Sequence, residues 1–207
     1  MDNFIFILKG VKISIIIYLL TLFLSLPLGF ILALLVNGKS KKIKNIIEIY
    51  TWIFRGTPIL LQIFFIYYGL PIFGIRFNQF YSALITFTFN YSAYFCEIFR
   101  GGLNSIDVGQ YDACKVLGFT PFQTLKRIVF PQVLNNVLPA ISNEAISLIK
   151  DTSLISVIGM SDILRNSREI VTRDFTISPF IMAGFIYLLL STIIILGIKK
   201  VEKKVEF

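Results

Sequence analysis

Residues 13–36 read ISIIIYLLTLFLSLPLGFILALLV, an apolar run without a single charged side chain. A helix of roughly 20 such residues is enough to cross the hydrocarbon core of a membrane. The run is too long for the apolar part of a secretory signal, and no small-residue cleavage site follows it, so we expect the protein to retain it. This stretch predicts an integral membrane protein whose first span lies at about residues 11–36.

The rest of the chain continues this composition. Of its 207 residues, 56% are hydrophobic and only 15% are charged, whereas soluble domains average about 25% charged residues. Four further blocks are long and apolar enough to span, at about residues 49–70, 80–99, 128–149 and 179–198. Backbone groups in lipid must hydrogen-bond within their own segment, so we expect helices. The sequence predicts an all-α polytopic membrane protein with five transmembrane helices in one domain, residues 1–207.

Basic residues lie between the apolar blocks and predict the orientation. Segments 37–45 and 100–127 and the tail after residue 198 are rich in Lys and Arg. Five spans place all three on one side, which the positive-inside rule assigns to the cytoplasm. The N-terminus is then outside and the C-terminus cytoplasmic. The outer stretch 152–178 is a partial exception, because it carries Arg165, Arg168 and Arg173.

Several chemistries are not expected of this chain. The net charge of +8 is not gathered in one patch, so we expect no nucleic-acid binding. There is no histidine, and Cys96 and Cys114 form no Cys-x-x-Cys pair, so we expect no metal site. Gly38-Lys39-Ser40 looks like the end of a phosphate-binding loop, but Ala33 stands where that pattern needs glycine. We therefore expect no cofactor on this chain.

The long basic segment 100–127 contains the strongest motif. It reads Asp112-Ala113-Cys114, then Gly118 after three residues, then Ile128-Val129-Phe130-Pro131 after nine more. Small residues at Ala113 and Cys114 would let a short helix lie flat in a partner's groove. Gly118 can adopt the left-handed conformation that ends a helix. The alternative is an amphipathic helix that rests on the lipid surface.

This motif resembles the loop by which bacterial ABC import permeases dock onto their ATPase, which has Glu-Ala-Ala, Gly and Ile-x-Leu-Pro at the same spacing. Asp112, Cys114 and Phe130 depart mildly from that pattern. Over about residues 55–154 the chain also resembles the polar amino-acid permeases, the histidine/glutamine/arginine/glutamate group. The matching motifs are Arg55-Gly56-Thr57-Pro58, Gln62, Tyr68-Gly69-Leu70-Pro71, Ala93-Tyr94, Glu97, Arg100-Gly101-Gly102, Ser105-Ile106, Gly109-Gln110, Pro139, Asn143 and Lys150-Asp151-Thr152-Ser153-Leu154.

The resemblance implies the permease subunit of a bacterial amino-acid ABC importer in the cytoplasmic membrane, working by alternating access. It implies a second permease subunit, identical or different, and an extracellular binding protein that delivers the amino acid. It also implies two ATPase subunits that hold ATP and magnesium. The residues implied to dock them are Gly109, Asp112, Ala113, Cys114 and Gly118. No bond of the substrate changes, so the chain is not expected to be an enzyme.

Polar residues inside the third apolar block are candidates for binding substrate. Charges in a membrane segment are costly and usually face a cavity or a partner. Asn90, Tyr94 and Glu97 are spaced by four and three, so they share one helical face. For Asn90 and Tyr94, the structural alternative is hydrogen bonding between helices. For Glu97 it is an ion pair with Arg100, three residues on.

The fourth block offers a second polar stripe, made of Asn136, Asn143, Ser147 and Lys150 at helical spacing. We predict Asn143 and Ser147 as substrate-binding residues, together with the acidic residues Glu144 and Asp162. Carboxylates near the apolar blocks favour a cationic ligand. We therefore expect a basic amino acid such as arginine, with glutamine-like substrates next.

Two other functions are compatible with a helical membrane protein. One is a scaffold or assembly subunit that holds other membrane proteins together. The other is an ion-coupled secondary transporter, which inverted repeats of hydropathy would favour. We find no such repeat in the five blocks.

Overall fold

The computed structural model describes residues 3–205, and within that range it contains helices and no strand. The α-helices are α1 (Asn3–Val36), α2 (Lys41–Gly56), α3 (Ile59–Phe64), α4 (Gln79–Asn104), α5 (Val108–Val116), α6 (Pro121–Thr124), α7 (Phe130–Asp151), α8 (Ile163–Asp174) and α9 (Ser178–Val205). Short π or 3-10 turns complete the chain as η1 (Phe65–Gly69), η2 (Leu70–Phe73), η3 (Leu125–Val129) and η4 (Thr152–Ile158). The all-α prediction is confirmed.

Two helices are long and apolar enough to cross a membrane by themselves, Asn3–Val36 and Ser178–Lys200. A third span exists if α2 and the segment Ile59–Phe73 cross together as a bent pair. The other two predicted spans correspond to α4 and α7, which have the length but a more polar composition. The count of five therefore stays a prediction.

The second predicted span is not one helix. The prediction of a continuous helix over residues 49–70 is wrong, because α2 ends at Gly56 and α3 leaves it at an angle of 104°. Pro58 has no N–H to donate, and it forces the residue before it out of helical geometry. Thr57 accordingly has φ −119° and ψ 144°. Pro27 and Pro139, in contrast, lie within continuous helices.

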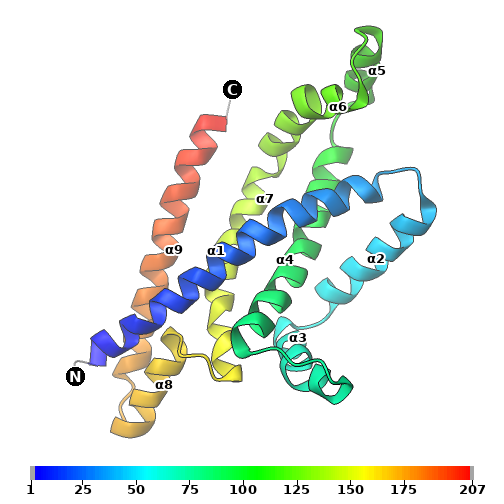
Figure 1. Cartoon of the computed structure of the whole chain (residues 1–207). Helices are drawn as coiled ribbons and strands as arrows, with labels where there is room; N and C mark the ends of the chain where they lie inside the picture. Colours follow the sequence, from blue (N-terminus) through cyan, green and yellow to red (C-terminus); the bar gives the residue numbers. More distant parts are fainter. Residues whose placement is uncertain (1–2, 206–207) are drawn as a thin grey trace.

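Small residues bring the long helices together. Figure 1 shows α1 running obliquely across the bundle, where it packs on α4. A Cβ on Gly29 of α1 would lie 2.6 Å from the Phe95 Cβ of α4, so only glycine permits this approach. A Cβ on Gly102 of α4 would likewise clash with the Val137 side chain of α7. Contacts of this kind are typical of membrane helices, which associate through close packing.

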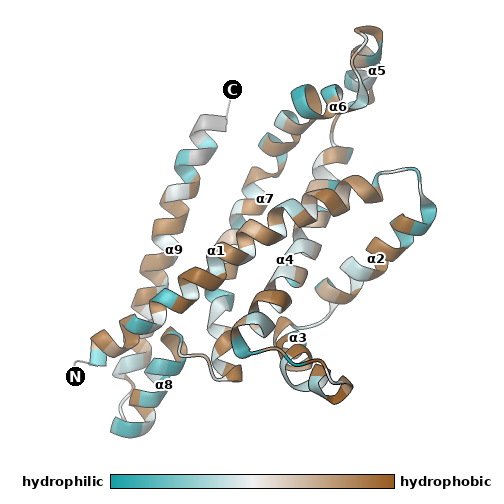
Figure 2. Cartoon of the chain, in the orientation of Figure 1, coloured by the Kyte–Doolittle hydropathy of each residue, from teal (hydrophilic) through white to brown (hydrophobic). Residues whose placement is uncertain are grey.

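Polar segments gather at the two ends of the bundle. In Figure 2 the brown, hydrophobic colour follows α1 and α9, while teal marks α8 and the turn between α1 and α2. That turn, α5, α6 and the C-terminal end of α9 lie toward the top of Figure 1, and α8 lies toward the bottom. The three lysine-rich segments thus lie toward the same end, as the predicted topology requires.

Candidate functional site

A cavity of about 570 Å³ lies where the α2–α3 break faces α4 and α7. This volume is typical of sites for small ligands. Its lining residues are Arg55, Gly56, Thr57, Pro58 and Ile59 at the break, Asn90, Tyr91 and Tyr94 of α4, and Glu144, Ser147 and Asp151 of α7. The α4 residues stand near the middle of that helix. We call this space the polar cavity.

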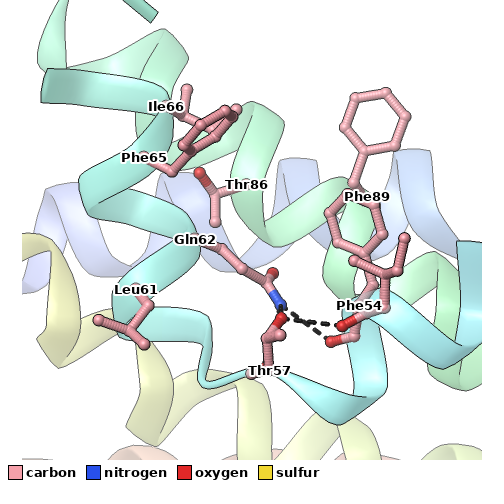
Figure 3. Close-up of a pocket in the computed structure, with 9 residues that line it drawn as sticks. Phe54, Thr57, Leu61, Gln62, Phe65, Ile66, Thr86 and Phe89 are labelled. Atoms are coloured by element: carbon pink, nitrogen blue, oxygen red, sulfur yellow. Dashed lines mark hydrogen bonds between the residues drawn. The ribbon is translucent and has the colours of Figure 1, made fainter. Parts of the chain in front are cut away.

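Two side-chain amides, those of Gln62 and Asn90, form hydrogen bonds at the helix break. Gln62 Nε2 donates to the Phe54 carbonyl at 2.9 Å and to Thr57 Oγ1 at 2.8 Å (Figure 3). Asn90 Nδ2 donates to the same Phe54 carbonyl at 2.9 Å and to Gln62 Oε1 at 3.0 Å. Non-helical backbone is tolerated at membrane depth only when its polar groups find such partners. Asn90 therefore both lines the polar cavity and braces its wall.

An apolar cavity of about 340 Å³ lies on the other side of the break (Figure 3). Leu61, Phe65 and Ile66 of the α3–η1 segment and Phe89 of α4 line it. It contains no charged side chain. Of the two cavities at the break, only the polar cavity therefore offers charged side chains.

Glu97 is held by two arginines at the edge of the polar cavity. Its Oε2 lies 2.6 Å from Arg100 Nη2 and 3.5 Å from Arg55 Nη1. Thr51 Oγ1 donates to its other oxygen at 3.4 Å. Arg55 also lies over the Tyr94 ring, 5.5 Å from the centroid. This arrangement matches the ion-pair alternative for Glu97, and it ties α2 to α4.

The α7 wall supplies two carboxyl groups, those of Glu144 and Asp151. Tyr91 donates from its hydroxyl to Asp151 Oδ2 at 2.8 Å. Glu144 lines the cavity and has no hydrogen bond or ion pair with any residue in 3–205. Arg55 is the cation that lines the cavity on the α2 side. The cavity thus presents a guanidinium on one wall and two carboxyl groups on another.

Three polar candidates lie outside the polar cavity. Asn143 is exposed, and Asn136 Nδ2 donates to Ser105 Oγ of α4 at 3.0 Å. Asp162 is fully buried and caps α8, accepting from the Arg165 amide at 2.9 Å. Burial raises the pKa of the Asp162 carboxyl above its ordinary value, and the amide hydrogen bonds offset only part of this rise. Its position identifies Asp162 as a structural residue that fixes α8.

Two of the three α7 residues predicted to bind substrate, Glu144 and Ser147, line the polar cavity. The stripe that faces the cavity contains Glu144, Ser147 and Asp151, while Asn143 lies one position to the side. Both stripes satisfy helical spacing, so the rotation of α7 depends on its partners. Tyr91 and Asp151 were not predicted as substrate-binding residues. The acidic Asp151 at the end of an apolar block was the available signal.

The loop after α4 folds as two short helices around a glycine turn. Asp107 Oδ1 caps α5 by accepting from the Gly109 amide at 2.6 Å. Gly118 has φ +75°, the left-handed conformation expected of it. Cys114 is buried within the chain. Large apolar side chains are exposed instead, namely Val108, Val116, Leu117 and Phe122.

The helical bundle, the polar cavity at a helix break and the two-helix loop at one end are compatible with the predicted permease. The chain belongs to the family described as binding-protein-dependent transport system inner membrane component, whose model matches residues 25–207. The family resemblance stated from the motifs is confirmed.

Individual relatives are permeases for several amino acids. The chain is 36% identical to the arginine transport system permease protein ArtQ of Bacillus subtilis, covering 97% of this chain and 93% of that protein. It is 34% identical to a putative glutamine transport system permease protein GlnP of Rickettsia typhi, with coverages of 96% and 92%. It is also 34% identical to the L-cystine transport system permease protein TcyB of Bacillus subtilis, with coverages of 95% and 85%.

Solved structures share the fold. The crystal structure of an amino acid ABC transporter with histidines has a TM-score of 0.87 and 30% identity, covering 96% of this chain and 94% of that one. The MetNI methionine ABC transporter, in an inward-facing conformation, has a TM-score of 0.74 at 15% identity, with coverages of 97% and 94%. The second likeness concerns the fold alone.

Proposed function

We propose that this chain is the membrane subunit of an ATP-driven importer that moves polar, and in particular basic, amino acids into the bacterial cytoplasm. The observation that carries the proposal is the polar cavity with its opposed charges. In the proposed assembly, two permease subunits alternate between outward and inward access in the cytoplasmic membrane. The N-terminus is outside, and an extracellular binding protein delivers the amino acid.

The charges of the cavity suit an amino acid. The α-carboxylate of the ligand would pair with Arg55, whose planar guanidinium suits carboxylates. A cationic group would meet Glu144 and Asp151 on the opposite wall. Glu97 contributes less than the sequence suggested, because two arginines already neutralise it. The preference for basic substrates therefore rests on the α7 carboxyl groups.

Coupling to ATP is assigned to the loop around α5 and α6. The exposed apolar side chains of Val108, Val116, Leu117 and Phe122 offer a surface for the ATPase. Large exposed apolar residues of this kind mark protein or membrane contacts. The partner ATPase would hold ATP and magnesium, and ATP binding would move the loop and the helices joined to it.

The first prediction is that Glu144→Gln weakens the binding of arginine more than the binding of glutamine. Loss of one charged partner costs about 1–3 kcal/mol, or roughly 5- to 150-fold in affinity. The measurement is ATPase stimulation of the reconstituted importer by arginine and glutamine, titrated side by side. Asn143→Ala is the matched control, because Asn143 precedes Glu144 on α7 and its side chain is exposed outside the polar cavity. Equal losses for both ligands would contradict the basic preference, and failure of any ATPase to co-purify would contradict the importer itself.

A further inference from the structure

Four lysines lie close together at the turn that joins α1 to α2, namely Lys39, Lys41, Lys42 and Lys44. All four are exposed. Glu48 is the one acidic residue of α2, and it pairs with Lys44 at 3.8 Å. The other three lysines form no ion pair within residues 3–205. The turn therefore presents a concentrated positive charge that the chain itself does not neutralise. We call these four residues the lysine turn.

The lysine turn lies at the boundary of the first membrane span. Residues 13–36 of α1 carry no charge, and at the rise of an α-helix they extend roughly 36 Å. The hydrocarbon core of a membrane is roughly 30 Å thick, and the oblique course of α1 takes up the excess length (Figure 1). Because the turn follows this run directly, its ammonium groups lie at the depth of phospholipid headgroups. Basic clusters in this position attract anionic lipids.

The start of α2 adds to the need for a counter-ion. Lys41, Lys42 and Lys44 stand in the first turn of the helix, which contains no acidic residue. Positive side chains are unfavourable there, because the helix dipole is positive at the same end. Ser40 precedes the helix, and its side chain forms no capping hydrogen bond. An external anion bound by the lysines would therefore also stabilise the beginning of α2.

One side of α2 is fixed to the bundle and the other is exposed. Ile47 is buried, and the Tyr50 hydroxyl donates to a backbone carbonyl of α4 at 2.6 Å. On the other side, Ile46, Ile49 and Trp52 are exposed. A hollow of about 420 Å³ lies along this side, lined by Asn45, Glu48, Ile49 and Trp52. The positive turn thus continues into an exposed apolar strip on the same helix.

We infer that the lysine turn and the exposed side of α2 bind an anionic phospholipid. The phosphate of the headgroup would pair with the lysines, and an acyl chain would lie along α2 between Ile46 and Trp52. Charge and apolar surface follow one another here in the same order as in a phospholipid. The inference rests on the membrane location of the family and not on the amino acid transported. Because α2 ends at the break in the wall of the polar cavity, the lipid would anchor the start of the helix that forms this wall.

The test uses the fluorescence of Trp52, the only tryptophan of the sequence. Trp52 follows Lys41 by eleven residues, or roughly 16 Å along the helix, which is about half of the hydrocarbon thickness. Bromine atoms at the middle of an acyl chain would therefore quench Trp52 when the headgroup is bound at the lysine turn. The probes are phosphatidylglycerol and phosphatidylcholine with brominated chains. Each is titrated into vesicles of unbrominated phosphatidylcholine that contain the full-length chain.

At low salt, the apparent affinity for brominated phosphatidylglycerol should be roughly fivefold higher than for brominated phosphatidylcholine. High salt should bring this ratio close to one, because exposed charges are screened. The pair Lys41→Gln and Lys42→Gln should do the same, whereas Lys41→Arg with Lys42→Arg should keep the preference. The matched control is Lys199→Gln with Lys200→Gln. These exposed lysines lie on α9, across the bundle from α2 (Figure 1).

Three results would overturn the inference. The first is equal quenching of the wild-type chain by the two lipids. The second is an equal loss of preference in the α2 and α9 glutamine pairs, which would indicate general surface charge, or a loss in the arginine pair. The third is the absence of quenching by either lipid, which would indicate that protein, such as a second copy of the chain, covers this side of α2. Because no amino acid is present in these vesicles, failure here is distinct from failure of the proposed function.

Discussion

At the scale of single residues, the structure changes the role of Glu97. The sequence placed it on one face with Asn90 and Tyr94, which favours contact with substrate. In the structure, Glu97 bonds Arg100 and lies 3.5 Å from Arg55, so it links α4 to the end of α2. An acid engaged by two guanidinium groups has little charge left for a ligand. Its influence on transport would therefore act through the position of Arg55.

The second prediction follows from that role. Glu97→Gln should reduce uptake of arginine and glutamine by the same factor, because it releases Arg55 without changing the charge that meets the substrate side chain. Glu144→Gln should instead separate the two substrates. The measurement is uptake into vesicles with each amino acid in turn. A selective loss of arginine uptake in the Glu97→Gln variant would contradict this role and indicate that Glu97 contacts the substrate.

At the scale of elements, two breaks in helical structure support the proposed mechanism. The first is the α2–α3 break at Thr57 and Pro58, which opens the polar cavity. The second is the turn at Gly118 between α5 and α6, which has φ +75°. A Cβ at Gly118 would meet nothing within 4 Å. The need for glycine there is conformational, because residues with side chains rarely adopt a positive φ.

The third prediction concerns this turn. Gly118→Val should strain the loop by about 1–3 kcal/mol, the usual cost of an unfavourable backbone conformation. Transport should be lost and the ATPase should dissociate more readily, while the subunit still inserts in the membrane. Gly118→Asn is the control, because asparagine tolerates the left-handed region. Co-purification of the ATPase and uptake should be measured together, and normal values for the valine variant would argue against ATPase docking at this loop.

At the scale of the whole molecule, the arrangement of polar ends bears on orientation. The α1–α2 turn, the α5–α6 loop and the end of α9 lie toward one end of the bundle, and α8 lies toward the other (Figure 1). The proposed topology places the first end in the cytoplasm and α8 outside. Both native cysteines are buried, so they give little background to thiol labelling.

The fourth prediction tests this orientation. Val116 is 88% exposed in α5, and Ile177 is 71% exposed between α8 and α9. A membrane-impermeant thiol reagent should label Ile177→Cys in intact cells, because that residue would lie outside. It should label Val116→Cys only after permeabilisation and removal of the ATPase. The reverse pattern would overturn the orientation.

Composition and motif spacing were sufficient to predict the all-α membrane architecture and the permease family. Those properties depend on apolar runs and glycine positions, which are local in the chain. The α2–α3 break and the rotation of α7 were decided only by the tertiary structure. Helical spacing allows either Asn143 or Glu144 to face inward, and contacts with α4 and the break select Glu144. Likewise, Gln62 and Asn90 reach the Phe54 carbonyl only because three separate segments meet there.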